Sequence, residues 1–422
     1  MIPLSALRGF TFVMLSALTS FAWSAPASYQ DIRAMGMGGT GVAAARPAAA
    51  SFFNPALLAS EPDQGGNTWN LMLPGINGRL ADRNNLPDRV GEIQDSILSI
   101  ILSFLANTMD SPETQRNAGR LADHLQALEG EMLRADLAMG ASLTRPNSGL
   151  GLGLHGSARI RGTVQGNVKG GDIQLLRSIE NRNPPTDFFG GDLGSNAHVL
   201  ATGVIEAGVT LARQFPLGQQ QLALGLTPKI MQLHTFNYYE TLYDFSAASF
   251  NAADYATSQL GANLDAGAVY SFGESQQWRL ATSVRNLFPM TLEAKAYPPG
   301  SRFFQPQPPR LKIRPLITLG LAHSGERHTL TADLELTENP PFGPEAATRW
   351  LSLGGEYRLN DGVALRSGFR QNRASNTGAP GIKETTQASL GLGLSPGRLH
   401  LELAATVGDN DIGAGLEVNL RF

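Results

Sequence analysis

The sequence predicts an all-β fold, a single transmembrane antiparallel β-barrel of about fourteen strands whose first extracellular loop is helical. Three observations carry this prediction. The chain begins with an apolar leader, many later segments alternate between apolar and polar residues, and long connections between these segments alternate with short ones. This combination is typical of barrels that cross the outer membrane with strands.

The N-terminus is typical of a cleaved signal peptide. Arg8 precedes an apolar run over residues 10–22, which is shorter than the roughly 20 residues that a membrane-spanning helix needs. Small residues near its end offer cleavage sites, so we expect a signal peptide over residues 1–24 and a mature chain that begins near Ala25 or Ser28. Export of a strand-rich chain predicts a location in the outer membrane of a Gram-negative cell.

Composition excludes several classes of function. The 422 residues include 47 Gly and no Cys, 16% of them are charged, and the formal net charge is −3. Without Cys there are no disulfides, thiolate metal sites or thiol redox chemistry. A near-neutral chain offers no strongly basic face to phosphates, so we expect no nucleic-acid partner.

The membrane must be crossed by strands, because the longest later apolar run, residues 97–106, is broken by Ser99 and Ser103. Alternation is clearest at the C-terminus. An apolar row there alternates with a polar one: Ile412, Ala414, Leu416, Val418, Leu420 and Phe422 against Gly413, Gly415, Glu417, Asn419 and Arg421. A strand places the two rows on opposite faces, and in a membrane barrel the apolar face meets lipid while the polar face lines the lumen.

Fourteen segments of this kind make residues 67–422 the predicted barrel. They lie at 67–75, 134–145, 149–163, 198–214, 221–238, 261–273, 277–288, 311–323, 328–337, 348–359, 363–372, 385–395, 399–407 and 411–422. An even number brings both ends of the barrel to the same side of the membrane.

Connection lengths favour a membrane barrel over a soluble sandwich. Long or moderate connections at 76–133, 164–197, 239–260, 289–310, 338–347 and 373–384 alternate with short turns at 145–148, 215–219, 273–276, 324–327, 360–362 and 395–398. Outer-membrane barrels have short periplasmic turns and longer outer loops. We therefore expect residues 76–133 to be the first extracellular loop, and residues 408–410 to be a tight outer turn.

This first loop carries apolar residues at helical spacing in two stretches. Residues 90–104 form one, and Ser111 as N-cap with Pro112 at the first position predicts a second helix. The apolar face of the second helix comprises Leu121, Leu125, Leu128 and Met132. These faces either pack against each other or hold a hydrophobic ligand. In the second case the candidate apolar ligand contacts are Ile97, Ile101 and Phe104.

Several segments resemble a known group of barrels. Arg-Ala-Met-Gly-Met-Gly-Gly-Thr-Gly from Arg33 and Phe-Phe-Asn-Pro-Ala from Phe52 resemble the mature N-terminus of the FadL-like barrel superfamily. Within it, residues 71–75, the expected helix at 84–101 and the overall length are similar to the outer-membrane barrel family of conjugal transfer protein TraF. Further similar segments are residues 264–267, 284–287 and 333–337 and the terminal Phe422.

The resemblance implies a fourteen-stranded barrel whose N-terminal segment, residues 25–66, folds into the lumen as a hatch. The candidate hatch residues are Arg33, Gly36, Gly38, Gly39, Asn54 and Pro55. It also implies that Phe422 is the signal read by the barrel-assembly machinery.

Two motifs could indicate a cofactor site or a catalytic site, but the sequence around them lacks the elements that such sites require. Residues 36–41 fit G-x-G-x-x-G, but no apolar strand precedes them and Pro47 interrupts the alanine-rich stretch after them, so the glycines are better explained by close passage along the barrel wall. His155 and Ser157 share one strand face without a G-x-S-x-G motif, which favours a polar lumen-lining pair over a hydrolase site. The seven His are scattered. We expect no enzymatic activity, no metal and no cofactor.

Charged residues of both signs recur on the inward faces. The candidate lumen charges are Asp265, Arg285, Asp333, Glu335, Glu356, Arg358, Arg366, Glu402 and Glu417. An open selective pore favours segregated charge, whereas mixed Arg and Glu form pairs that hold a hatch and close the lumen. We favour this structural role over contact with a substrate.

Two functions remain. The first is a gated channel for small apolar solutes, with outer-membrane lipid and a hydrophobic small molecule as partners. The alternative is a structural or accessory outer-membrane component linked to a conjugal transfer or secretion apparatus. The apolar helices and the hatch favour the channel, whereas the mixed-sign lumen and the resemblance to TraF favour the accessory role. We favour the channel.

Overall fold

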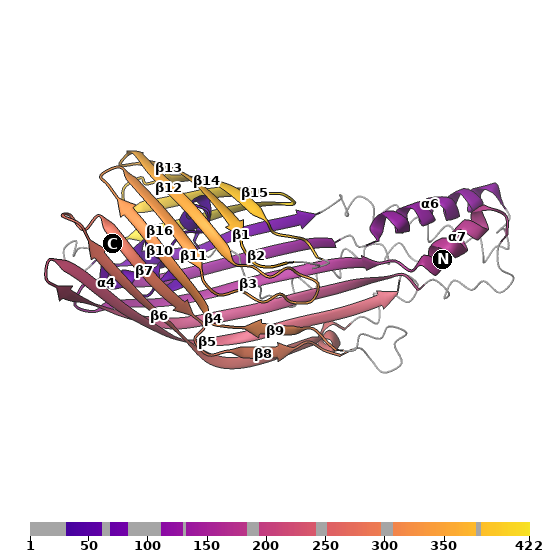
Figure 1. Cartoon of the computed structure of the whole chain (residues 1–422), viewed down its shortest axis with the longest axis horizontal. Helices are drawn as coiled ribbons and strands as arrows, with labels where there is room; N and C mark the ends of the chain where they lie inside the picture. The colour runs from indigo at the N-terminus through magenta and orange to yellow at the C-terminus, as the bar shows by residue number, and fades with distance from the viewer. Residues whose placement is uncertain are drawn as a thin grey trace.

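The computed structural model describes residues 31–60, 68–82, 111–129, 132–183, 194–241, 251–296, 307–376 and 381–422. Within these ranges, fourteen strands form one closed antiparallel barrel (Figure 1). The predicted all-β class, the closed barrel and the strand number are confirmed. The predicted signal peptide lies outside the described residues.

Each barrel strand pairs with its neighbours in the chain, and the first and last strands close the ring. The strands are β1 (Asn70–Asp82), β2 (Met132–Arg145), β3 (Gly151–Asn167), β4 (Asn196–Leu217), β5 (Gln220–Thr241), β6 (Ala256–Phe272), β7 (Trp278–Arg285), β10 (Leu316–Ser324), β11 (His328–Glu335), β12 (Trp350–Asn360), β13 (Val363–Asn372), β14 (Thr386–Leu394), β15 (Leu399–Gly408) and β16 (Asp411–Arg421). Most of the predicted segments agree with these strands to within a few residues.

Alternating faces explain why these segments become barrel strands. On β16, Ile412 is 65% exposed on the outside, whereas Glu417 is 1% exposed and faces the lumen. Leu416 and Phe422 are exposed on the outer face as well. The outer surface is therefore apolar and suited to lipid, while the polar row is removed from it.

The two ends of the barrel differ. The connections β2–β3, β4–β5, β6–β7, β10–β11, β12–β13 and β14–β15 are short and gather at one end, which we call the short-turn end. The other end is the long-loop end. The wall is uneven in height, because β4 and β5 have 22 residues each whereas β7 and β11 have 8 (Figure 1).

The predicted first strand ends too early. It was expected to stop at residue 75, but β1 continues to Asp82, so residues 76–82, which were expected in the first long loop, belong to the strand. Its pairing with β16 shifts in register between Met72 and Ile76, where Pro74 lies. A bulge accommodates the proline, which cannot donate to the ladder, and the strand resumes beyond it.

The predicted strand 311–323 is two strands. β9 (Arg310–Ile313) pairs with β8 (Met290–Glu293) in a separate two-stranded sheet, and only β10 belongs to the barrel. Pro315 lies between β9 and β10, where it ends one strand before the next begins.

Two helices lie beyond the long-loop end (Figure 1). α6 (Pro112–Leu128) begins as predicted, with the Ser111 side chain accepting the amide of Thr114, and it packs against α7 (Gly170–Glu180) of the next long connection. Met132 was expected on this helix but is the first residue of β2. None of the described helices has the length and apolar character to cross a membrane.

Residues 31–60, which we call the inner segment, lie inside the barrel. They form α2 (Ile32–Gly36), the 3₁₀ turn η1 (Pro47–Ala49), α3 (Ala50–Phe53) and α4 (Leu57–Ser60). Another 3₁₀ turn, η3 (Ala252–Tyr255), precedes β6. Small inward residues of the wall, Ala212, Ala223, Val269, Ala281 and Ala322, join the alanine-rich inner segment in one buried cluster. Small side chains on both sides let the segment fit within the ring.

The orientation can be tested by labelling, since the chain has no Cys. Asn183, after α7, and Asn360, at the end of β12, are both exposed, at opposite ends of the barrel. We expect a membrane-impermeant maleimide to label the Asn183→Cys variant on intact cells and the Asn360→Cys variant only after lysis. Labelling of Asn360→Cys on intact cells would reverse the orientation.

Candidate functional site

The inner segment is anchored to the wall by a buried arginine. Arg33 on α2 donates to both carboxylate oxygens of Glu356 on β12, at 2.8 and 3.3 Å. Its Nη1 donates to the carbonyl of Ala44, 2.8 Å away, which also ties α2 to the next turn of the inner segment. A two-pronged pair between guanidinium and carboxylate fixes orientation as well as position.

Glu356 is the centre of a larger group of charges. It also accepts from Arg366 of β13, at 2.7 Å, and lies 3.6 Å from Arg46 of the inner segment. Glu402 of β15 accepts from Arg46 at 2.6 Å and pairs with Arg366. We call these five residues the anchor cluster. Removing Glu356 or Glu402 leaves buried guanidinium groups with fewer partners, which is costly in a low-dielectric interior.

Two further carboxylates bind main-chain amides of the inner segment. Asp333 of β11 accepts the amides of Gly41 and Val42, at 2.7 and 3.0 Å. Glu417 of β16 accepts the amide of Ile32 at 3.1 Å. The structure therefore brings five of the predicted lumen charges into contact with the inner segment: Asp333 and Glu417 here, and Glu356, Arg366 and Glu402 directly or through the anchor cluster.

Asn54 extends the attachment to the opposite part of the wall. Its amide nitrogen donates to the carbonyls of Val42, Ala268 of β6 and Thr282 of β7, at 3.0 to 3.2 Å. Its oxygen accepts the amide of Ala56, which places Pro55 against the wall glycines Gly225 and Gly267.

The glycines of the inner segment lie close to the wall backbone. Gly38 has a φ of +71°, and a Cβ there would lie 2.8 Å from the carbonyl oxygen of Leu353. A Cβ on Gly36 would lie 2.9 Å from the Cα of Gly391. Gly39 also has positive φ, at +86°. Close approach, the geometry expected for these positions from the sequence, is what the structure has at Gly36 and Gly38.

A second polar group lies on β3 to β7. Lys229 of β5 is fully buried and its Nζ donates to Glu206 at 3.0 Å and to Asp265 at 2.8 Å. Arg285 lies 3.7 Å from Glu206, to which Ser157 also donates at 3.1 Å. Lys229 and Glu206 were missed in the sequence, although both have inward parity on predicted strands.

Glu335 and Arg358 do not bind the inner segment. Glu335 accepts the amide of Trp350 at 2.8 Å. Arg358 has inward parity but is exposed at the short-turn end, where it donates to the carbonyls of Gly325 and Glu326. Its prediction as a lumen charge is wrong, because β12 extends past the lumen at this end.

A cavity of about 160 Å³ lies between the inner segment and the long-loop end. Val42, Phe52 and Phe53 of the inner segment form its floor, and Arg159, Arg285 and Trp350 are among the wall residues around it. Asn339 and Thr348, which bridge to each other in the β11–β12 connection, line it from the long-loop side.

Connections at the long-loop end fold inward over this cavity. Residues 336–349 join β11 to β12, yet Phe342 packs in an apolar cluster with Leu200 of β4 and Leu233 of β5. The strand order places β11 and β12 almost opposite β3 and β4 in the ring. The connection therefore crosses the lumen. β8 and β9 join the same apolar cluster through Leu292 and Leu311.

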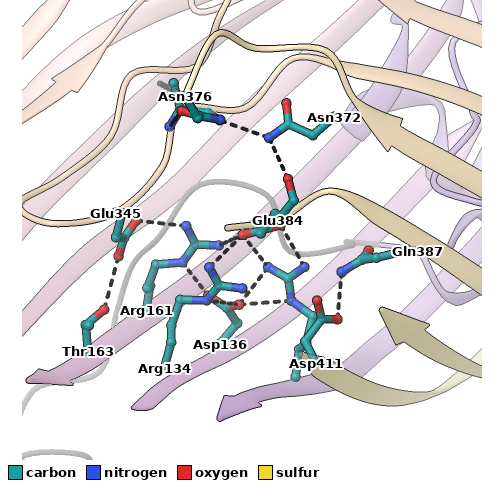
Figure 2. A network of polar contacts seen from close by, with 12 residues as sticks. Arg134, Asp136, Arg161, Thr163, Glu345, Asn372, Asn376, Glu384, Gln387 and Asp411 are labelled. Atoms are coloured by element: carbon teal, nitrogen blue, oxygen red, sulfur yellow. Dashed lines mark hydrogen bonds and ion pairs between the residues drawn. The ribbon is translucent and has the colours of Figure 1, made fainter. Parts of the chain in front are cut away.

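A buried charged network holds these connections down (Figure 2). Glu345 accepts from Arg161 of β3 at 2.9 Å, and Glu384 of the β13–β14 connection accepts from Arg79 of β1 at 3.0 Å. Arg134 of β2 lies 2.8 Å from Glu384. Asp136, on β2, accepts from Arg79 and Arg161. We call these six residues the latch cluster: Arg79, Arg134, Asp136, Arg161, Glu345 and Glu384.

The two connections also bind each other. Asn376 donates to the carbonyl of Ala347 at 2.8 Å and accepts its amide at 2.9 Å. Asn372 donates to the carbonyls of Ala347 and Glu384 (Figure 2). The cover over the cavity is therefore one connected unit.

The candidate apolar ligand contacts Ile97, Ile101 and Phe104 lie outside the described residues. For the second predicted helix, the apolar face is covered by another helix: Leu121 and Leu125 of α6 pack with Leu176 and Ile179 of α7. The described residues contain no group of three side chains that could hold a metal ion.

The fold is a closed antiparallel β-barrel of fourteen strands whose lumen is filled by the inner segment. A family model described as F plasmid transfer operon, TraF, protein matches residues 51–335, more than half of the chain, and the chain belongs to this family. No curated relative matches the chain.

Solved structures share the fold at low sequence identity. The Ralstonia pickettii toluene transporter TbuX is 14% identical with a TM-score of 0.51, covering 93% of this chain and 98% of its own. A Pseudomonas aeruginosa FadL homologue is 13% identical with a TM-score of 0.52, covering 95% and 99%. These matches show the fold.

The anchor cluster gives a stability prediction. Replacing Glu356→Gln leaves Arg33 and Arg366 buried with a weakened partner, so we expect a loss of roughly 3–5 kcal/mol, measured as a lower urea midpoint for loss of the heat-modifiable barrel. The exposed control Arg358→Gln should change stability by less than about 0.5 kcal/mol. Equal midpoints for the two variants would contradict the anchoring role.

The latch cluster gives a pH prediction. Burial opposes ionisation of Glu384, but Arg134, Arg79 and Arg161 hold the pKa of its carboxyl well below the usual value of 4.5. A depressed pKa means that the stabilisation is fully present above the ordinary pKa and is lost as pH falls from there through the depressed value. We expect the difference in thermal midpoint between wild type and Glu384→Gln to stay constant from pH 7 to about pH 5 and to shrink in more acidic buffer. Shrinkage already above pH 5 would contradict the pairing.

Proposed function

We propose that the chain is a gated channel that takes small apolar solutes across the outer membrane. The observation that carries the proposal is the filled lumen: the inner segment occupies it and leaves a cavity floored by Val42, Phe52 and Phe53. An apolar floor replaces the water around an apolar solute with apolar contacts as the solute passes, which a polar pore does not do.

The charges of the lumen support this function because most of those described form ion pairs with one another. Glu356 and Glu402 bind arginines of the inner segment and the wall, and Glu345 and Glu384 bind arginines of β1 to β3. Charges paired in this way hold the inner segment and the connections in place. They do not form the separate rows of like charge that an ion-selective pore has.

Gating is proposed to act at two places. The inner segment is the hatch, with Arg33, Gly36, Gly38, Gly39, Asn54 and Pro55 setting its fit to the wall, and the domain division is then a signal peptide at 1–24, a hatch at 25–66 and a barrel at 67–422. The connections held by the latch cluster form the second barrier.

Assembly and location are part of the same proposal. Outer-membrane lipid surrounds the barrel, with the long-loop end outside the cell. Phe422 is exposed, and its main chain pairs with Trp69 beside β1, so the terminal residue lies at the seam that closes the ring. We propose that the barrel-assembly machinery reads this residue.

The likeness in fold to the toluene transporter TbuX supports the choice of apolar solutes. The alternative, an accessory outer-membrane component of a conjugal transfer or secretion apparatus, is supported by the description of the family. In that role the filled lumen would be a structural plug.

Conductance and uptake test the channel. Deleting residues 31–60 should raise single-channel conductance in planar bilayers, because removing a plug opens a lumen that fourteen strands leave wide. Vesicles with the wild-type barrel should take up toluene faster than empty vesicles. The control Arg358→Gln, which leaves the inner segment in place, should behave as the wild type.

The accessory role predicts a different result. If the deletion leaves conductance unchanged and the wild-type barrel adds no toluene uptake, while loss of the gene impairs plasmid transfer or secretion, the channel is refuted and the accessory function replaces it.

A further inference from the structure

The cavity above the inner segment has two chemically different sides. Its floor is apolar, with the rings of Phe52 and Phe53 beside Val42. The wall around it carries Arg159, Arg285 and the indole of Trp350. A purely apolar solute would use only the floor.

Three hydrogen-bond donors around this cavity have no acceptor among the described residues. They are Nε of Arg159, Nε of Arg285 and Nε1 of Trp350. Arg159 is 8% exposed and Trp350 is 4% exposed, so bulk water does not surround them. Buried donors are normally satisfied, and leaving them unsatisfied is unfavourable. Three such donors around one cavity indicate an acceptor that enters it.

The donors around the cavity favour an anion. Arg159, Arg285 and Arg370 line it together with the carboxylates Asp333 and Glu335, whereas Arg314, at its edge, is exposed. Arg159 and Arg285 lie 3.5 and 3.7 Å from Glu206 through their Nη2 atoms, so the Nε–H of each is the donor that remains for a ligand. A carboxylate that accepts from these guanidinium groups forms charge-assisted hydrogen bonds, which are stronger than those of a neutral acceptor.

We infer that this cavity is a binding site for a small monocarboxylate with an apolar body of about one aromatic ring. The carboxylate would accept from Arg285, Arg159 and the indole N–H of Trp350, and the ring would lie over Phe52 and Phe53. This inference rests on the proposed channel, whose solute would then be an amphipathic acid rather than a hydrocarbon.

The size of the cavity limits the body of the ligand. Its volume of about 160 Å³ is close to the roughly 150 Å³ of an engineered protein cavity that holds benzene. A single ring therefore fills it, while a long alkyl chain does not fit without movement of the inner segment or of the cover. Benzoate matches both the size and the charge.

Calorimetric titration of the purified full-length barrel in detergent tests the inference without any need for transport. Benzoate should bind with a measurable enthalpy and raise the thermal midpoint. Benzyl alcohol, of similar size and without charge, should bind at least about tenfold more weakly, because it cannot form charge-assisted hydrogen bonds. Equal affinity for the two compounds would overturn the inference, and so would the absence of benzoate binding.

Two variants locate the site. Arg285→Gln should weaken benzoate binding by about tenfold to a hundredfold, and Trp350→Phe, which keeps a ring but removes the indole N–H, by about threefold to tenfold. Arg358→Gln removes one positive charge at the short-turn end and should leave benzoate affinity unchanged. Heat modifiability confirms that each variant is folded. A loss of affinity in Arg358→Gln equal to that in Arg285→Gln would mean that benzoate responds to net charge alone.

The two proposals can fail separately. If toluene enters vesicles through the barrel and benzoate does not bind, the channel stands and the acid site is refuted. If benzoate binds as described while neither toluene nor benzoate crosses the membrane and deletion of residues 31–60 leaves conductance unchanged, the binding site stands and the channel is refuted.

Discussion

The two-pronged pair between Arg33 and Glu356 meets the constraint on which the rest of this structure depends, which is that a charged group facing the lumen needs a partner. Closing a sheet into a ring turns one face of every strand inward, and here that face carries carboxylates and guanidinium groups away from bulk water. Such groups are stable only with partners. The inner segment supplies them in the form of two arginines and a series of main-chain amides. Wall and inner segment are therefore one hydrogen-bonded unit, and the alanines and glycines of both allow them to come close enough for these bonds.

The same constraint is met at the long-loop end by different parts of the chain. At the short-turn end the wall contributes the carboxylates Glu356, Glu402 and Glu417 beside Arg366, and the further cations Arg33 and Arg46 come from inside. At the long-loop end the wall contributes an excess of cations, Arg79, Arg134 and Arg161 beside Asp136, and the carboxylates Glu345 and Glu384 come from two connections. At neither end do the charges of the wall named here sum to zero. At each end, a segment that is not a barrel strand supplies the opposite charges.

Periodicity explains how much of this could be predicted. Alternation in the sequence shows the two faces of a strand, so the strand number and the inward direction of Glu356 or Glu402 could be predicted from it. The membrane barrel was distinguished from a soluble sandwich by the alternation of long and short connections. Pairing could not, because the partner of Glu356 depends on where residues 31–60 lie. Glu345 and Glu384 were missed since connections have no period that shows which way a side chain points. Two prolines led to opposite errors in the predicted strands. The first strand was predicted to end near Pro74, which instead lies in a bulge within β1, and one strand was predicted across Pro315, which instead separates β9 from β10. Local sequence does not distinguish these cases.

The separation of the two charged groups bears on how a solute could pass. The anchor and latch clusters have no residue in common. The anchor cluster attaches the inner segment to the wall, and the latch cluster attaches two connections at the long-loop end. In the proposed channel, one cluster loses its ion pairs while those of the other remain. The cavity lies between them, with its floor on the inner segment and part of its lining on the β11–β12 connection. In the proposed channel, a ligand bound there would contact both barriers at once. A ligand that binds a single state of either barrier more tightly shifts that barrier toward it. Passage can then proceed by opening one side at a time, without a continuous aqueous pore at any stage.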